Sequence, residues 1–259
     1  MGRKPFAIKA LEYLHSKGTD VIAVITADQP SGIFSTALAE TAKNLNMPVI
    51  QEKTLYKAIE NDNYCHNSIE LNNVDLVISY LYSRKIKPDL INLPSKGCIN
   101  FHPAPLPELR GLGGYNVAIL EGMPAYGVSA HFVDETFDTG DIIQVKRFQI
   151  DPLRETAFSL EQKSQVIMFE LFKEVIDTLQ SGKELNRIRQ GSGRYINRKE
   201  FETLRQVNKD DTPEVINRKI RAFWYPPYGG ACITIDGKEY TLINDDLLAE
   251  IKCYYHYKQ

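Results

Sequence analysis

Residues 76–110 read LVISYLYSRKIKPDLINLPSKGCINFHPAPLPELR. The run LVISY at 76–80 and the run GCINF at 97–101 have the length and the apolar content of buried strands. The segment between them ends near Leu93-Pro94 and has room for a short helix. A strand, a short helix and a second strand in this order predict one repeat of a mostly parallel sheet with helices on its faces.

The same alternation continues on both sides of this stretch. After Gly114 a helix is expected up to Glu121, and the period then changes to two, so that Val128, Ala130 and Phe132 share one face of a strand. The other expected elements are a strand at 21–26, a helix at 33–45, a short strand at 49–50, a returning strand at 142–150 and an amphipathic helix at 156–179. The sequence therefore predicts an α/β domain.

The first residues depart from this pattern. Alternating α/β domains open with a strand, yet Met1–Pro5 leads directly into a segment of helical period at Phe6–His15. Either the first strand lies upstream of Met1, or the sheet forms without it. Gly2 has no strand before it, so it is no part of a dinucleotide-binding fingerprint.

The composition changes after Gly191-Ser192-Gly193, and we place a domain boundary near residue 190. Residues 1–190 are expected to form the catalytic domain, with its first strand missing. Residues 191–259 are expected to form a small mixed α/β annex. The annex contains a short charged helix at 213–221, the aromatic run FWYPPYGG at 223–230 and a hairpin turned at Asp236-Gly237.

The overall composition favours small-molecule chemistry. The 259 residues include 31 basic and 33 acidic side chains, so no general field attracts nucleic acid or an anionic membrane. The four cysteines form no CxxC pair, which argues against a zinc ribbon and a disulfide framework. No apolar run approaches the roughly 18 residues that a membrane helix needs. We expect a cytoplasmic protein without a metal and without a membrane or nucleic-acid partner.

Asn100 and His102 are the first candidates for chemistry. They stand two residues apart at the end of an expected strand, so both side chains face the same side of the sheet. Ligands bind at the carboxyl ends of the strands in such folds. An imidazole can transfer a proton, and an amide can donate a hydrogen bond to a developing oxyanion. The alternative is a strand-end histidine whose ring is satisfied by the local backbone.

Asp138 is the third candidate and lies in the turn FDTGD, where Gly140 allows a tight return and Thr139 can brace the loop. An acidic turn residue is usually only solvated. Near a histidine, however, a carboxylate raises the basicity of the ring and orients it. His131, on the preceding strand, is interpreted as a packed residue or a neighbour of the substrate rather than as the base.

The segment INFHPAPLPELRG at 99–111, followed by HFVDETFDTGDII at 131–143, resembles the catalytic core of the 10-formyltetrahydrofolate-dependent formyltransferases. The looser similarity extends from residue 5 to about residue 180. The resemblance implies a Rossmann-like fold, formyl transfer, and a catalytic set made of Asn100, His102 and Asp138. It also implies that loops near 79–86 and 133–138 hold the formyl donor, 10-formyltetrahydrofolate. The residues implied for this role are Tyr80, Arg84, Ile86, Val133 and Asp134.

Within that family, GLGGYN at 111–116 and RAFWYPPYGGA at 221–231 look most like the enzymes that formylate dTDP-linked amino-deoxysugars. The substrate-binding residues then expected are Tyr115, Asn116, Trp224, Tyr225 and Tyr228. The three aromatic rings of the annex offer flat faces on which a thymine could stack. The alternative is a purely structural aromatic cluster. A nucleotide sugar is the expected partner, and a homodimer is possible.

Other functions remain open at this point. A methionyl-tRNA formyltransferase needs a region that grips phosphates, but residues 195–259 hold ten basic and ten acidic residues. A formyltetrahydrofolate deformylase would use the same three residues to transfer the formyl group to water. That function does not explain the aromatic run at 223–230. A regulatory nucleotide-binding module without catalysis is the alternative outside the enzymes.

Overall fold

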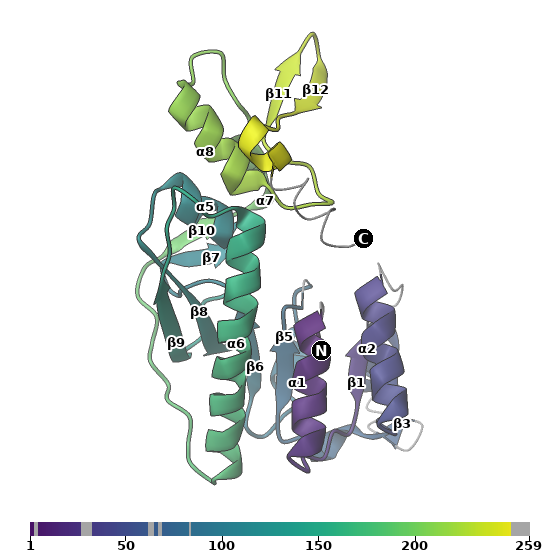
Figure 1. Ribbon diagram of the computed structural model, residues 1–259. Coiled ribbons are helices and arrows are strands. Elements are labelled where there is room, and N and C mark those ends of the chain that lie inside the picture. Colours follow the sequence, from purple (N-terminus) through teal and green to yellow (C-terminus); the bar gives the residue numbers. More distant parts are fainter. Residues whose placement is uncertain (3–4, 27–32, 62–64, 67–68, 83, 250–259) are drawn as a thin grey trace. The chain divides into compact units, whose positions relative to one another are not determined.

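The computed structural model describes residues 1–2, 5–26, 33–61, 65–66, 69–82 and 84–249 (Figure 1). Contacts divide the chain into two compact units. Unit 1 consists of Met1–Glu108, Val128–Lys146 and Gln165–Gly193, and unit 2 consists of Leu109–Gly127, Arg147–Ser164 and the chain from Arg194 onward. The last change between units lies close to the expected boundary at residue 190. Unit 2 also includes two earlier segments, so neither unit is one continuous stretch.

The middle of the chain forms a four-stranded sheet. Its strands are β5 (Val77–Tyr80), β6 (Cys98–His102), β8 (Ala125–Phe132) and β9 (Ile142–Gln149), in the order β5-β6-β8-β9. Strands β5 and β6 are parallel, as expected from residues 76–110, while β6 and β8 are antiparallel. The sheet is therefore mixed.

The register of this sheet aligns three polar residues. Ser79 on β5 pairs with Asn100 on β6, and Asn100 pairs with His131 on β8. Residues in register present their side chains on the same face of a sheet. Because His102 follows Asn100 by two positions, its side chain lies on that face as well.

The N-terminal part of unit 1 has its own short sheet. Strands β1 (Val24–Thr26) and β2 (Val49–Gln51) pair in parallel with each other. They alternate with the helices α1 (Pro5–Ser16), α2 (Ile33–Asn44) and α3 (Glu52–Glu60). Within the described residues, the chain ahead of α1 makes a single parallel bridge, from Gly2 to Tyr80. The expected first strand is thus not among the described elements.

Shorter elements complete unit 1. The sequence did not signal α3, the pair β3 (Cys65–His66) and β4 (Ile69–Glu70), or the 3-10 turn η1 (Leu71–Asn73). Helix α4 (Pro88–Ile91) is the short helix expected between β5 and β6. Helix α6 (Ala157–Gln180) begins in unit 2, and its later turns belong to unit 1.

The core of unit 1 is aromatic at its centre. The rings of Tyr80, Phe101 and Phe172 are fully buried, and their centroids lie 5.1–5.7 Å apart. These residues come from β5, β6 and α6, so one cluster fixes the helix against the two strands that carry the polar row.

Unit 2 gathers its elements from distant parts of the chain. Strands β7 (Leu109–Gly111) and β10 (Arg194–Ile196) pair in parallel, and helix α5 (Gly114–Leu120) packs against α8 (Pro213–Phe223). In the sequence, α7 (Arg198–Leu204) follows β10 and precedes α8. The hairpin of β11 (Cys232–Ile235) and β12 (Lys238–Thr241) turns at Asp236 and Gly237. Both turn residues have a positive φ, as a two-residue turn of this kind requires.

Two kinds of feature are absent from the described residues. None of the helices found there is long and apolar enough to cross a bilayer. Likewise, the described side chains contain no group of three or more His, Cys, Asp or Glu placed to hold a metal ion.

Candidate active site

The side-chain amide of Asn100 is held between two neighbours on the polar row. The hydroxyl of Ser79 donates to Asn100 Oδ1 at 2.7 Å, and Asn100 Nδ2 lies 3.1 Å from His131 Nε2. Both partners come from the strands that flank β6. Two bonds from opposite sides fix which end of the amide carries the N–H groups, and they commit one of the two N–H groups to His131.

His131 is held as a single tautomer. Its Nδ1 lies 2.7 Å from the carbonyl oxygen of Phe132, which can only accept, so Nδ1 carries a proton. Its Nε2 then accepts the hydrogen bond from Asn100. The ring is buried, with 2% of its surface exposed. This placement agrees with the interpretation of His131 as a packed residue, and it gives the ring the role of positioning Asn100.

His102 lies at the end of β6 with its ring almost fully buried. Ser129, opposite His102 in the register, stabilises the chain that follows. The Ser129 hydroxyl donates to the carbonyl of Ala104 at 2.8 Å and accepts from the amide of Leu106 at 2.9 Å. The proline-rich exit from β6 is therefore tied back to β8, which restricts the backbone that carries the imidazole.

Asp138 approaches this face from the turn between β8 and β9. Its Oδ1 is 3.5 Å from His102 Nδ1 and 3.6 Å from His131 Nε2. The first distance suits an ion pair once the His102 imidazole is protonated. The structure thus brings Asn100, His102 and Asp138 together on one face, as the sequence analysis expected.

The turn that carries Asp138 is braced on both sides. Asp138 itself has a φ of 57°, in the left-handed region. The side-chain amide of Gln190 donates to the carbonyls of Asp138 at 3.1 Å and of Gly140 at 2.6 Å. Thr139 donates to the carboxylate of Asp134 at 2.7 Å, so the expected brace by Thr139 is confirmed. These contacts hold a strained residue in place.

The residues expected to hold folate have mixed environments. Tyr80 and Ile86 are core residues, with 2% and 6% of their surfaces exposed, so their side chains offer no face to a ligand in this conformation. Arg84 is half-exposed and forms an ion pair with Glu52. Val133 and Asp134 lie in the loop directly after β8, where the Asp134 carboxylate accepts from the amide of Thr136 at 3.0 Å. Val133 and Asp134 therefore remain the better candidates for contacts with folate.

The expected substrate residues also differ among themselves. Asn116 is buried, and its amide donates to the carbonyl of Ala222 at 2.7 Å, so this side chain joins α5 to α8 and has a structural role. Tyr115 is half-buried, with its ring centroid 5.5 Å from that of Tyr126. The aromatic run of the annex is more open. The rings of Tyr225 and Tyr228 lie 5.6 Å apart at 31°, and 60% of Tyr228 is exposed.

Comparison with known proteins identifies the family. The sequence profile described as formyl transferase matches residues 2–176. The methionyl-tRNA formyltransferase of Myxococcus xanthus is 33% identical over 92% of this chain and 75% of its own length. The 4-N formyltransferase of Francisella tularensis superimposes with a TM-score of 0.73 at 22% identity, over 93% of each chain. The N-formyltransferase of Helicobacter canadensis, solved with folinic acid and dTDP-3-aminofucose, gives a TM-score of 0.70 at 25% identity, over 91% of this chain and 82% of its own.

An amide, an imidazole and a carboxylate on one face of a sheet can stabilise a developing oxyanion and accept a proton, which are the two needs of group transfer to an amine. The chain belongs to the formyl transferase family. It is a formyl-transfer enzyme, and formyltetrahydrofolate is its one-carbon donor.

The described residues fit such a donor. The oriented amide of Asn100 has a second N–H for a carbonyl oxygen, and no described residue accepts from it. The imidazole of His102 and the carboxylate of Asp138 stand beside it. A formyl group has one strong acceptor, its oxygen, and an attacking amine has a proton to lose. The three side chains match these two needs.

We expect Ser79→Ala to lower kcat by about five- to tenfold, the cost of one hydrogen bond that orients a reacting group. KM for both substrates should change little, because the Ser79 hydroxyl contacts Asn100 and only 2% of the Ser79 surface is exposed. Steady-state formylation kinetics measure both constants. Ser181→Ala is the matched control, since that exposed hydroxyl donates to the backbone of Thr178 on α6. An unchanged kcat for Ser79→Ala would show that Asn100 needs no such orientation.

Proposed function

We propose that this enzyme moves the formyl group of 10-formyltetrahydrofolate to the amine of a nucleotide-linked amino-deoxysugar, with a dTDP-sugar favoured. The observation that carries the proposal is the open aromatic run of unit 2. Trp224 directly follows α8 as its C-cap, and Tyr225 and Tyr228 come next with their rings close together. A planar base gains about 1–3 kcal/mol by stacking on such a ring.

The aromatic run is held in place by its surroundings. The carbonyl of Trp224 accepts from the amide of Phe158 at 3.0 Å, and the Tyr225 hydroxyl donates to the carboxylate of Glu161. The ring of Phe158 lies 6.2 Å from that of Tyr225, at 75°. Tyr225 is thus anchored on one side, while Tyr228 keeps an open face. An anchored ring loses less entropy on binding a ligand.

The charge balance of the annex supports a small nucleotide over tRNA. Residues 195–259 carry ten basic and ten acidic side chains. Several of the cations are already paired, including Lys219 with Asp211 at 2.6 Å and Arg205 with Glu202 at 2.9 Å. A protein that grips a nucleic-acid backbone needs unpaired cations in number.

Methionyl-tRNA is the second candidate acceptor, and one specific observation favours it. The curated relatives of Myxococcus xanthus and Geotalea uraniireducens, 33% and 31% identical, are methionyl-tRNA formyltransferases. The chain spans 75% of the length of each of these two relatives. The acceptor is therefore the property that experiment must decide.

In the mechanism that we propose, each of the three side chains of unit 1 has one task. Bound formyltetrahydrofolate supplies an electrophilic formyl carbon. The Nδ2–H of Asn100 donates to the formyl oxygen and stabilises the negative charge that grows there on attack. The imidazole of His102 accepts the proton that the amine loses, and it returns a proton to the folate nitrogen as the bond between that nitrogen and the formyl carbon breaks. Asp138 orients the imidazole and stabilises it once it is protonated, at the 3.5 Å separation seen here.

Binding experiments test the nucleotide part of the proposal. We expect Trp224→Ala and Tyr228→Ala each to weaken the binding of dTDP by about tenfold or more, the loss of one stacking contact, while folinic acid binds as before. Isothermal titration of each ligand measures both constants. Tyr240→Ala is the matched control, because Tyr240 is another exposed tyrosine, on β12 of the same unit.

Two results would contradict this assignment. Unchanged dTDP affinity in both variants would mean that the rings take no part in recognition. An equal loss of dTDP and folinic acid binding, together with a lower melting temperature, would assign the rings a structural role.

A further inference from the structure

The chain that follows α6 runs along the start of β9. Ile188 and Ile142 form an antiparallel bridge, in which the amide of Ile142 donates to the carbonyl of Ile188 at 2.8 Å and the reverse bond measures 3.0 Å. Asn186 donates to the carbonyl of Ile143 at 3.4 Å. Because β9 is the last strand in the order of its sheet, its outer edge has backbone groups that another segment can bind. We call residues 186–190 the strap.

The strap is also held to the neighbouring strand. The guanidinium of Arg187 lies over the ring of Phe132, 3.6 Å from its centroid, in a cation–π contact. Phe132 is the last residue of β8, and the turn with Asp138 connects β8 to β9. The strap therefore contacts the strands on both sides of this turn.

Gln190 ends the strap and binds the turn itself. A side-chain amide has two N–H groups, and Gln190 Nε2 donates to two carbonyls, those of Asp138 at 3.1 Å and of Gly140 at 2.6 Å. Both bonds go to the backbone, so they leave the carboxylate of Asp138 directed at His102, 3.5 Å away. Asp138 has a φ of 57°, a conformation that persists only where its surroundings hold it. The bonds from Gln190 supply part of that hold.

The same stretch of chain also packs against the segment that carries His102. A Cβ built at Gly193 would lie 1.7 Å from the carbonyl oxygen of Pro107, so only a glycine fits there without a shift of the backbone. Pro107 belongs to the proline-rich exit from β6, which begins directly after His102. Gly193 follows Gln190 by three positions in the sequence. One short segment therefore contacts the supports of both His102 and Asp138.

We propose that Gln190 is a positioning residue for formyl transfer, which holds the Asp138 carboxylate at its working distance from His102. The inference rests on the catalytic roles proposed above for these two residues. Covering the edge of β9 would account for Ile188 and Asn186, since their bonds go to β9. It does not account for Gln190, whose two donors both bind the turn ahead of that strand.

Replacing Gln190 by methionine tests the proposal, because methionine has a similar length and no N–H group to donate. We expect Gln190→Met to lower kcat by about tenfold or more, since a displaced carboxylate orients the imidazole poorly, while KM for the donor and the acceptor stays within about twofold. Gln190→Asn keeps the amide on a shorter side chain, should show a smaller loss of the same kind, and provides the test should Gln190→Met not fold.

Steady-state kinetics and the melting temperature are measured together. A dTDP-linked amino-deoxysugar and methionyl-tRNA both serve as acceptors, so the result does not depend on which of them the enzyme prefers. Gln180→Met is the matched control, because Gln180 is another glutamine of unit 1 whose amide donates to a backbone carbonyl, that of Lys17 at 3.3 Å. This variant should keep wild-type kcat and KM.

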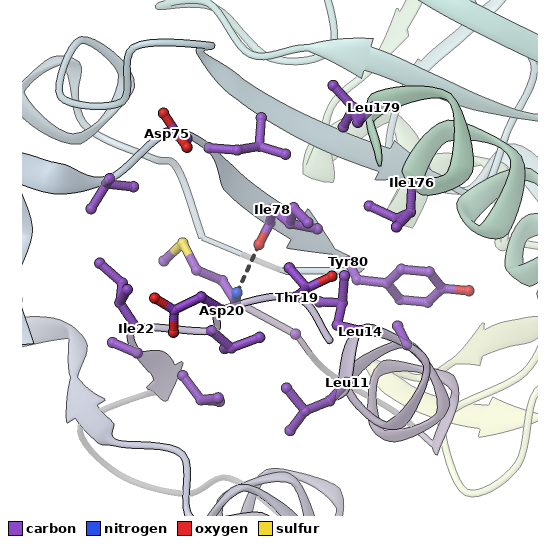
Figure 2. A pocket seen from close by; sticks show the side chains of 18 of the residues that line it. Leu11, Leu14, Thr19, Asp20, Ile22, Asp75, Ile78, Tyr80, Ile176 and Leu179 are labelled. Carbon is purple, nitrogen blue, oxygen red and sulfur yellow. Dashed lines mark hydrogen bonds between the residues drawn. The ribbon is translucent and has the colours of Figure 1, made fainter. Parts of the chain in front are cut away.

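The surroundings of Gln180 explain the choice of this control. Gln180 lines a cavity of about 480 Å³, together with Thr19 and Leu179 (Figure 2). Among the described residues that line this cavity, none belongs to the polar row or to the turn with Asp138. The control thus removes a similar hydrogen bond at a place without contact to the proposed catalytic residues.

A double-variant cycle separates positioning from a general role in folding. Because Gln190 is proposed to act through the carboxylate, adding Gln190→Met to Asp138→Ala should lower kcat no further. A kcat for Gln190→Met within about twofold of wild type, with Asp138→Ala impaired, would overturn this proposal alone. An undiminished further loss in the double variant would overturn it as well, since Gln190 would then act independently of Asp138. Normal turnover of Asp138→Ala would contradict the catalytic role of Asp138 and, with it, this inference.

Discussion

Replacing His102 by alanine is expected to lower kcat for formyl transfer by about a hundredfold or more, because the amine then loses its proton without a positioned base. The ring is nearly buried at the end of β6, with Asp138 3.5 Å away. Binding of folinic acid should remain close to normal, since the proposed task of His102 concerns the attacking amine. Single-turnover formylation separates the chemical step from substrate binding.

The same experiment extends to the partners of His102. Asn100→Ala and Asp138→Ala should each cost a similar factor, and the double variants should lose far less than the product of the single losses, because the three side chains act as a unit. His15→Ala is the matched control, since His15 is an exposed histidine at the end of α1. Near-normal turnover of His102→Ala would mean that the base lies elsewhere, even though the family assignment would stand.

Gly140→Ala is expected to lower kcat by roughly a hundredfold, a cost typical of moving a reacting group by about 1 Å. A Cβ at this position would lie 2.0 Å from the carbonyl oxygen of Phe132, so the turn that carries Asp138 must shift. The shift would also strain the hydrogen bonds from Gln190 to the carbonyls of Asp138 and Gly140. Steady-state kinetics and the melting temperature are measured together.

Gly191→Ala provides the matched control for Gly140→Ala. A Cβ at Gly191 would meet no heavy atom within 4 Å, and the residue adjoins Gln190 in the chain. We expect this variant to keep wild-type kinetics. If Gly140→Ala also kept wild-type kinetics, the position of Asp138 in its turn would not matter for the reaction.

Periodicity was sufficient to predict the elements that carry the site. Asn100 and His102 stand two apart in an apolar run, and a period of two places both on one face. The turn FDTGD predicted the hairpin of β8 and β9 with Asp138 at its tip. The resemblance to formyltransferases joined these two motifs, because nothing within either motif says that they meet in space.

Contacts that depend on strand register were not predictable from the sequence. Ser79 and His131 flank Asn100 only because β5 and β8 pair with β6 in one particular register. Gln190 reaches the Asp138 turn from a loop about 50 residues later. The burial of Tyr80 in the aromatic core follows from the packing of α6, which a local pattern does not encode.

The division of the chain into two units could not be predicted from local sequence patterns either. The composition changes near residue 190, but β7 pairs with β10 and α5 packs on α8, so residues 109–127 belong to the same unit as the later segment. Short elements such as α7 and β10 lack the length for a clear period. Long-range pairing, which no local window contains, decides where such segments belong.

Transfer of the formyl group from 10-formyltetrahydrofolate to a panel of acceptors is the most direct test of the proposed function. The panel contains dTDP-, UDP- and GDP-linked amino-deoxysugars, methionyl-tRNA, and buffer alone to detect release of formate to water. We predict that a dTDP-linked amino-deoxysugar is formylated with the highest kcat/KM and that formate release is slow. Efficient formylation of methionyl-tRNA with no transfer to any sugar would contradict the account.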